Sequence, residues 1–293
     1  MSSYNGEKYI REQIDSILAQ KLDMQLDLWV RDDGSTDATT HILQEYEAAG
    51  HLHWYSGENK RSAHSFWDLI LHCPGYDYYA FADQDDYWEP NKLQNGIDLI
   101  KDCNTPALSF ANALLVDQDL NSLGRNVYKT CPSLDFWTLS CAGGILGCTI
   151  VFNQSLATLI QACPMPSKMI MHDFYIALIC SLAGGTICFN ESSQMKYRQH
   201  GNNVVGVSRS KLSALKDRIQ TISRRPSVTI GQQAHTLLMQ YPALGTPAQQ
   251  AWLKKLADYR FWNRVCLACS AKTRYPSYNK SITLRLAILF GNR

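Results

Sequence analysis

The feature that most constrains this chain is an apolar segment that ends on a cluster of carboxylates. Residues 78–81 predict a buried strand, and Asp83, Asp85 and Asp86 follow it before a proline that suits a helix start. In open α/β sheets, ligands bind in the crevice outside the carboxyl ends of the strands. Carboxylates there can hold a hard cation through oxygen and leave room for phosphate. A solvated acidic turn is the alternative, but an EF-hand loop is excluded because Trp88 stands where that loop needs glycine.

A second apolar strand also ends in carboxylates. Residues 29–31 run into Asp32 and Asp33, and apolar residues at helical spacing follow each predicted strand in this half of the chain. Repeated strand and helix segments argue for a parallel sheet with right-handed crossovers. Capping of the next helix is an alternative role for Asp32 and Asp33. We therefore expect an α/β fold with a mostly parallel, Rossmann-like sheet that is flanked by helices.

Charge divides the sequence into two parts. Residues 1–206 contain 13 Lys and Arg against 24 Asp and Glu, whereas residues 207–293 contain 15 against 2. Helical patterns with interspersed aromatic residues dominate the second part. We expect one α/β domain at 1–206 and a basic helical region at 207–293. Such a region favours an anionic partner, namely a lipid surface, a polyanionic acceptor, nucleic acid or the acidic domain beside it.

The composition indicates the cellular compartment in which the protein is expected. We see neither a secretory leader at the N-terminus nor an apolar run near 20 residues, so we expect a cytosolic protein without a spanning helix. The ten cysteines are scattered through apolar segments. Buried thiols are therefore expected rather than disulfides.

Five motifs together resemble the family 2 glycosyltransferases, which have the GT-A fold. They occur in the family's order between residues 1 and 206. The wording of three of them is most similar to bacterial rhamnosyltransferases: Asp-Gln-Asp-Asp-Tyr-Trp, His-Asp-Phe and Tyr-Arg-Gln-His-Gly-Asn-Asn. The motifs are residues 3–6, 32–37, 83–88, 172–174 and 197–203.

The resemblance implies a role for particular residues. Asp173 corresponds to the general base, and Asp85 with His200 to the ligands of Mg²⁺ or Mn²⁺. Arg198, on the predicted loop with His200, would close over the diphosphate. For Asp86 we expect only a capping role at the helix that follows it. For Asp173 the alternative to catalysis is that it is an ordinary N-cap. The residues implied to hold the donor nucleotide are Ser2, Tyr4, Asp32, Asp33 and Asp83.

The resemblance also implies an activity. It is the inverting, metal-dependent transfer of L-rhamnose from dTDP-L-rhamnose to a glycan or lipid-linked acceptor in cell-surface polysaccharide synthesis. The enzyme would act in the cytoplasm, peripherally at the inner face of the membrane, with its basic region on the anionic lipid. Two alternatives remain open: a UDP-hexose transferase of the same fold, and a non-catalytic membrane- or nucleic-acid-binding protein on a decayed transferase fold.

The start of the sequence is unusual for such a family. Its members normally have a short apolar strand immediately before the Ser-Tyr-Asn-Gly turn, whereas here Met1 is already beside that turn. A gap at this central position would leave backbone groups of both neighbouring strands unpaired. We therefore expect a missing upstream segment.

Overall fold

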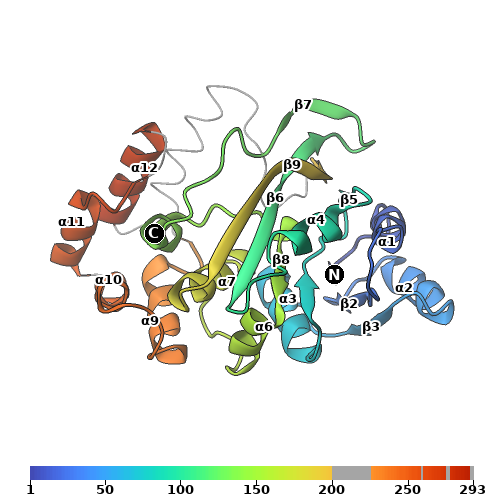
Figure 1. The fold of residues 1–293 in the computed structure, drawn as a ribbon, viewed down its shortest axis with the longest axis horizontal. Coiled ribbons are helices and arrows are strands. Elements are labelled where there is room, and N and C mark those ends of the chain that lie inside the picture. Colours follow the sequence, from blue (N-terminus) through green and yellow to red (C-terminus); the bar gives the residue numbers. More distant parts are fainter. Residues whose placement is uncertain (200–225, 259, 275–277, 291–293) are drawn as a thin grey trace. The chain divides into compact units, whose positions relative to one another are not determined.

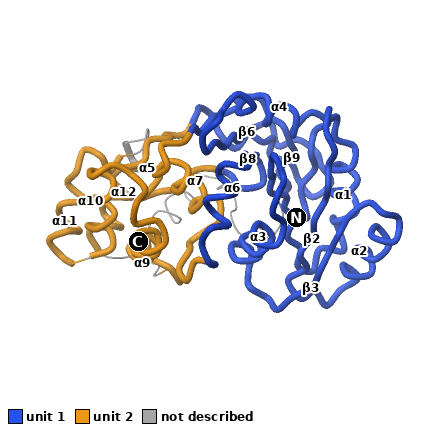
Figure 2. Tube along the Cα trace, turned by 60° about the horizontal axis from the view of Figure 1, so that its bottom comes forward, with its two compact units in different colours: residues 1–131, 146–165, 186–204 blue, residues 132–145, 166–185, 205–293 orange. Residues whose placement is uncertain are grey.

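The chain forms two compact units (Figures 1 and 2). The computed structural model describes residues 1–293 except 200–225, 259, 275–277 and 291–293, so the domain boundary expected at residue 206 lies outside the described residues. Each unit combines segments that are far apart in the sequence. Unit 1 consists of residues 1–131, 146–165 and 186–204, and unit 2 of residues 132–145, 166–185 and 205–293.

Unit 1 begins with three parallel strands and three helices, as the alternating sequence pattern predicts. They are β1 (Ser2–Ser3), α1 (Ile10–Leu18), β2 (Trp29–Asp32), α2 (Thr39–Ala48), β3 (His53–Ser56) and α3 (Arg61–His72). β2 lies between β1 and β3, with Ser2 opposite Arg31 and Trp29 opposite His53. Helices α1 and α3 bury an apolar face because their apolar residues recur at helical spacing.

The second sheet of unit 1 is mixed. It contains β4 (Tyr78–Ala80), β5 (Tyr87–Trp88), β6 (Ala107–Val116), β7 (Ser122–Asn126), β8 (Val151–Asn153) and β9 (Thr186–Arg198). The order is β4-β8-β6-β9-β5, with β7 paired to β6. Within it β6 and β9 run parallel, and the other described pairs are antiparallel. After β6 the chain forms a tight turn, in which Asp117 N–H donates to the Asn121 carbonyl oxygen. A parallel pair would need a longer crossover connection, so β7 runs antiparallel to β6. The expectation of a mostly parallel sheet is therefore correct for β1–β3 and wrong here.

Three further short helices belong to unit 1 and support the second sheet. They are α4 (Lys92–Asp98), the 3₁₀ turn η1 (Gly147–Thr149) and α6 (Gln154–Gln161). The side chain of Asn153 caps α6 by accepting from Leu156 N–H, and its Oδ1 also accepts from Ala107 N–H at 3.0 Å. This one amide therefore ties the start of β6 to the junction of β8 and α6.

Unit 2 is helical. Its helices are α5 (Phe136–Ala142), α7 (His172–Leu182), α9 (Ile230–Gln240), α10 (Pro247–Ala257), α11 (Phe261–Cys269) and α12 (Tyr278–Leu289). Two hydrogen bonds join its early and late segments: Trp252 Nε1–H donates to Ser140 Oγ at 2.8 Å, and the Tyr175 hydroxyl donates to Gln240 Oε1 at 2.7 Å. The C-terminal helices thus share a core with α5 and α7. No helix among the described residues is long and apolar enough to cross a bilayer.

The expectation of buried cysteines is only partly correct. Cys73, Cys141, Cys148 and Cys180 are buried, whereas Cys131, Cys266 and Cys269 are exposed. Cys148 bears on the candidate site because it lies beside the acidic turn.

Candidate active site

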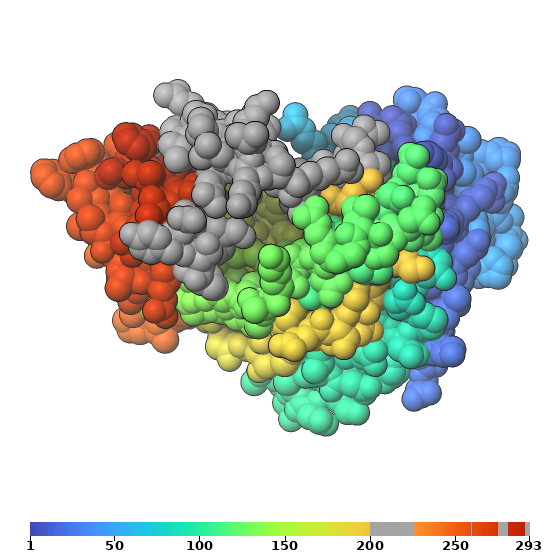
Figure 3. Space-filling view, turned by 90° about the horizontal axis from the view of Figure 1, so that it is seen from above, coloured from blue at the N-terminus to red at the C-terminus, as the bar shows by residue number. Residues whose placement is uncertain are grey.

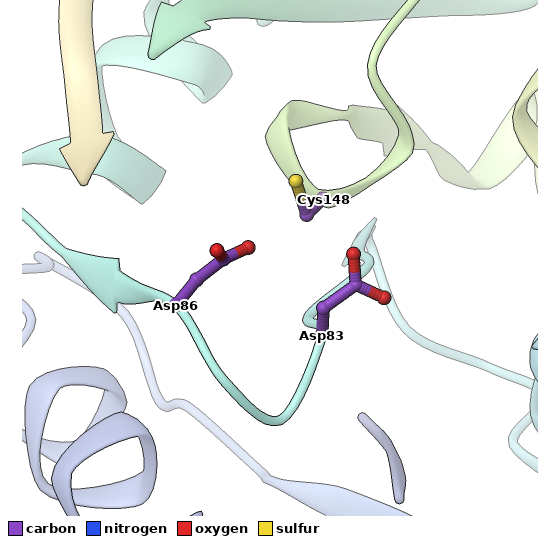
Figure 4. Close-up of side chains that lie close together, drawn as sticks. All are labelled: Asp83, Asp86 and Cys148. Carbon is purple, nitrogen blue, oxygen red and sulfur yellow. The ribbon is translucent and has the colours of Figure 1, made fainter. Parts of the chain in front are cut away.

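The acidic turn connects β4 to β5 and begins where the two sheets of unit 1 touch. Ser2 N–H donates to the Ala82 carbonyl oxygen at 3.3 Å, and Ser2 forms an isolated parallel bridge with Asp83. The carboxyl end of β1 is therefore next to the turn, as the predicted acidic edge requires. In Figure 4 the turn carries Asp83 and Asp86 on its two arms.

Asp83, Asp86 and Cys148 form a cluster at this turn. One ligand atom from each, a carboxylate oxygen or the thiol sulfur, lies within 4.8 Å of the others (Figure 4). Cys148 comes from η1, far along the chain, and no pattern in the sequence connects it to the carboxylates. Asp85, the predicted metal ligand, is half-buried and lies between Asp83 and Asp86 in the sequence, but it is not one of the three clustered residues.

Asp86 is buried in this cluster and does not cap a helix. Helix α4 begins at Lys92 with Asn91 as its N-cap, so the capping role expected for Asp86 is wrong. Burial, followed by the charges of Asp85 and Asp83, raises the pKa of Asp86 well above its ordinary value. Its Oδ2 is buried without a hydrogen-bond partner among the described residues. A cation would relieve both conditions, since it supplies charge and coordination to the carboxylates.

The donor atoms around the turn suit a hard divalent cation in part. Carboxylate oxygens are the preferred ligands of Mg²⁺ and Mn²⁺, and the orphaned Asp86 Oδ2 is an available one. A thiol is a soft ligand, and burial raises the pKa of Cys148 well above its ordinary value, which keeps it protonated. The carboxylates therefore fit such an ion, and the Cys148 sulfur borders the site without being a suitable ligand for it.

Arg198 is the last residue of β9, so its predicted place on the loop with His200 is wrong. Its side chain is buried and joins the acidic turn to two other segments. Its backbone N–H donates to Asp86 Oδ1 at 3.2 Å, and its Nε–H donates to the Asp85 carbonyl oxygen at 2.7 Å. The other two guanidinium nitrogens donate to the carbonyl oxygen of Gln118 and the carboxylate of Glu12. Every guanidinium nitrogen thus contacts protein, which holds the turn in place. The contact of Arg198 with the donor diphosphate stays a prediction.

Asp32 and Asp33 are buried and hold the loops beside them. Asp32 Oδ2 accepts from the backbone N–H groups of residues 34–35 at 3.1 and 2.9 Å, and the Asp33 carboxylate accepts from those of residues 60–61 at 2.8 and 2.9 Å. Neither caps the following helix, because α2 begins at Thr39 with no side-chain cap. These bonds fix the carboxyl end of β2, and the predicted nucleotide contacts of both residues remain predictions.

The N-terminal motif is clamped to the acidic turn through Gln84. The Tyr4 N–H donates to Gln84 Oε1 at 2.8 Å, and Gln84 Nε2 donates to the Tyr4 carbonyl oxygen at 2.9 Å. A Cβ at position 6 would lie 2.2 Å from Gln84 Oε1, so a residue other than glycine there would displace the amide that makes this clamp. Ser2 Oγ pairs with Ser65 Oγ at 2.7 Å, and the Tyr4 side chain is exposed. Gln84 was not predicted as a site residue.

Asp173 lies in unit 2, in the first turn of α7. The N-cap of α7 is Met171, so the alternative that Asp173 is an ordinary N-cap is wrong. Its Oδ1 accepts from the Phe174 N–H at 2.6 Å, and the residue is half-buried. Burial of the preceding His172 lowers the pKa of that imidazole to about 3. His200, the second predicted metal ligand, lies outside the described residues.

The first part of the chain matches a known protein family, and longer stretches are similar to known glycosyltransferases. Residues 1–113 match the family Glycosyl transferase family 2. The chain carries a family 2 glycosyltransferase domain. The dTDP-rhamnosyl transferase RfbG of Shigella flexneri is 29% identical over 228 residues, which is 71% of this chain and 74% of RfbG. The putative teichuronic acid biosynthesis glycosyltransferase TuaG of Bacillus subtilis is 28% identical over 205 residues, or 69% and 78% of the two chains.

The fold of this glycosyltransferase is GT-A, as predicted. The structure of S. aureus TarS 1–349 in complex with UDP-GlcNAc superposes with a TM-score of 0.54 at 14% identity, over 99% of this chain and 88% of that one. That identity supports the fold alone, and the mixed sheet with C-terminal helices agrees with it.

Proposed function

We propose that this glycosyltransferase moves L-rhamnose from dTDP-L-rhamnose to a hydroxyl of a glycan or lipid-linked acceptor, with inversion at the anomeric carbon. The observation that carries the proposal is the carboxylate turn at the end of β4, clamped by Gln84 to the N-terminal motif. The similarity to RfbG, a dTDP-rhamnosyl transferase, supports this donor, and the similarity to TuaG supports a role in cell-surface polysaccharide synthesis.

The donor nucleotide is proposed to lie along the carboxyl ends of β1, β2 and β4. Ser2, Tyr4, Asp32 and Asp33 belong to the first two of these ends. A carboxylate can accept the N3 proton of thymine and the ribose hydroxyl protons. Because Asp32 and Asp33 already accept from backbone amides, we expect them to shape the base and ribose pocket as well as to contact the nucleotide.

The diphosphate is proposed to bind at the acidic turn together with Mg²⁺ or Mn²⁺. Asp83, Asp85 and Asp86 would hold the ion, and His200 would complete its coordination. When bound, such an ion offsets the negative charge that develops on the departing diphosphate. Arg198 keeps the turn in the required conformation through its contacts with Asp85.

Asp173 is proposed as the general base. A carboxylate in this role takes the proton of the acceptor hydroxyl while the hydroxyl oxygen bonds to the anomeric carbon. The bond from that carbon to the diphosphate oxygen breaks on the opposite face, which inverts the configuration. The first turn of α7 suits a carboxylate, because the helix dipole favours negative charge there.

The basic region is proposed to bring the enzyme to an anionic membrane at its cytoplasmic face. Phe261 and Trp262 at the start of α11 are 55% and 74% exposed. Arg260 and Arg264 flank them, so aromatic and cationic groups lie together on one short segment. Aromatic rings insert at the lipid interface, and each basic group near an anionic surface contributes about 1 kcal/mol of binding free energy.

A UDP-hexose donor is the second candidate, since the resemblance to TarS is to a protein solved with UDP-GlcNAc. Carboxylates that hold nucleotide and diphosphate do not select the sugar. A non-catalytic role on a decayed fold is disfavoured by the retained Asp83, Asp85 and Asp173.

A donor panel tests the proposal. Purified enzyme is incubated with dTDP-L-rhamnose, dTDP-glucose, UDP-glucose, UDP-galactose and UDP-GlcNAc, each with Mg²⁺, with Mn²⁺ and with EDTA. We expect nucleotide diphosphate to be released from dTDP-L-rhamnose, with either ion and not with EDTA. Turnover of a UDP-sugar alone would select the second candidate, and release from none of the donors with added acceptor glycolipid would favour the non-catalytic alternative.

A further inference from the structure

Lys92, the first residue of α4, is a buried lysine that follows the acidic turn and β5 in unit 1. Its side chain is only 2% exposed, and its Nζ has no hydrogen-bond partner among the residues that the structure describes. Lysine is almost never fully buried without a partner, because an ammonium loses its hydration in the protein interior. The groups around Lys92 must therefore compensate its charge.

Two kinds of group surround the Lys92 ammonium. Its Nζ lies 3.6 Å from the centroid of the Trp88 ring, and indole is the aromatic ring that attracts a cation most strongly. Burial lowers the pKa of Lys92 to about 7, and the acidic groups of Cys148 and Asp86 oppose this shift. Lys92 thus lies within electrostatic reach of Asp86, whose Oδ2 is also buried without a hydrogen-bond partner in the described part of the chain.

The acidic turn has more negative charge than Arg198 can offset. Asp83, Asp85 and Asp86 place three carboxyl groups within four consecutive residues. The Arg198 side chain contacts the turn through the Asp85 carbonyl oxygen, while its ion pair is with Glu12. A further cation beside the turn therefore has a clear electrostatic role, and Lys92 is placed to supply it.

We propose that Lys92 is a positioning residue of the acidic turn, whose buried ammonium is the charge partner of Asp86 and competes with a divalent cation for that carboxylate. In the empty site, Lys92 compensates a carboxylate that would otherwise be buried alone, which is strongly unfavourable. Ion binding makes this compensation unnecessary, and like charges repel, so Lys92 should lower the affinity of the turn for the ion. The competition rests on the proposed metal site, whereas the pairing with Asp86 does not.

A purely structural role is the alternative for Lys92. Its methylene chain would then pack in the interior and its charge would have no effect on the turn. Methionine has nearly the length of lysine without the charge, whereas arginine retains the charge. The substitutions Lys92→Met and Lys92→Arg therefore separate the contribution of charge from that of packing.

A double-mutant cycle in metal-free enzyme tests the charge pair. Melting temperatures are measured with EDTA for wild type, Lys92→Met, Asp86→Asn and the double variant. Removal of one partner of a buried pair is costly, whereas removal of both is often neutral. We expect Lys92→Met to lower Tm by at least about 5 °C in wild type and by less than about 2 °C in Asp86→Asn. Lys92→Arg should lower Tm less than Lys92→Met does.

The surface pair of Lys101 and Asp98 provides the matched control cycle. Its Nζ and Oδ1 lie 2.9 Å apart, and both side chains are exposed. Exposed ion pairs contribute little to stability, so Lys101→Met and Asp98→Asn should have small and additive effects on Tm. Additive effects in the Lys92 and Asp86 cycle as well would overturn the charge pair.

Mn²⁺ binding, followed by electron paramagnetic resonance without donor, tests the competition independently of turnover. We expect Lys92→Met to bind Mn²⁺ at least about threefold more tightly than wild type, and Lys101→Met to bind it as wild type does. Unchanged or weaker binding in Lys92→Met would overturn the competition. Absence of Mn²⁺ binding in all of these proteins would contradict the proposed metal site instead, and coupling in the metal-free cycle would still support the charge pair.

Discussion

The guanidinium Nε–H of Arg198 donates to the backbone carbonyl oxygen of Asp85 at 2.7 Å, and this bond connects the end of β9 to the middle of the acidic turn. Arg198→Lys would keep the charge but lose the fork of donors that reaches Asp85, Gln118 and Glu12 together. We expect the Mg²⁺ concentration for half-maximal transfer to rise about tenfold, equivalent to about 1.4 kcal/mol. Steady-state assays across a magnesium titration measure it, with the exposed Arg125→Lys as the matched control. An unchanged metal dependence would refute the positioning role.

Asp85→Asn removes one anionic oxygen from the turn without changing its size. We expect transfer to fall at least about a hundredfold at saturating metal, with Tm within about 2 °C of wild type, because the half-buried side chain contributes little packing. The exposed Asp98→Asn serves as control. Near-normal turnover would exclude Asp85 as a ligand and leave Asp83 and Asp86, the two clustered carboxylates, as the candidates.

Asp173→Asn should separate chemistry from binding. Loss of a general base typically lowers turnover by 10²–10⁴-fold, while the donor site is untouched. We therefore expect kcat to fall within that range, with donor Kd changed by less than about threefold by calorimetry. A collapse of donor affinity would assign Asp173 to the donor site and require another base.

Stability should fall in acid partly because of His172. Its folded-state pKa of about 3 lies below the unfolded value of 6.5, so the unfolded chain binds a proton that the folded chain does not. The contribution is complete above pH 6.5 and declines as the pH falls toward 3. Between pH 7.5 and 5 it amounts to about 2 kcal/mol.

Urea unfolding at both pH values, in wild type and in His172→Phe, isolates this contribution. The variant should lose about 2 kcal/mol less than wild type on acidification. The exposed His235→Phe is the matched control and should follow wild type. Parallel pH profiles for all three proteins would contradict a buried neutral imidazole.

Phe261 and Trp262 should support membrane binding together with the basic residues. We expect full-length enzyme to sediment with phosphatidylserine vesicles at low salt and not with phosphatidylcholine vesicles. Binding should weaken as the Debye length falls from about 10 Å at 0.1 M salt to about 3 Å at 1 M. Phe261→Ser with Trp262→Ser should reduce binding at least fivefold, and the exposed Met239→Ser should not. Equal sedimentation of both variants would show that α11 does not take part in membrane binding.

The sequence patterns predicted those features of the fold that depend on residues close together in the chain. The apolar runs, the acidic strand ends and the order of strands and helices through α3 follow from local periodicity, and the motifs pointed to the GT-A fold. The sequence patterns did not predict Cys148 or Gln84 as site residues. Cys148 lies near Asp86, and Gln84 bonds to Tyr4, and in both cases the two residues are far apart in the chain. The mixed second sheet was missed for the same reason, since strand direction there depends on a hairpin after β6.

The basic C-terminal segment illustrates another limit. Its charge suggested a separate appendage, yet Trp252 and Gln240 bond to Ser140 and Tyr175 from the acidic part of the sequence. The charge of a sequence segment predicts the character of its exposed surface, whereas these two contacts lie in the interior of unit 2. A chain cut after residue 206 would expose that interior, so point variants such as those in α11 are the sounder test of membrane binding.

The clamp between Gln84 and Tyr4 has an evolutionary consequence. A methyl group at position 6 would collide with the Gln84 amide, and without that amide the Tyr4 backbone would lose both of its partners there. The two positions are thus constrained as a pair, although 77 residues separate them in the sequence. Among related sequences, any side chain larger than hydrogen at position 6 should occur together with a shorter residue at position 84, so the pair should covary.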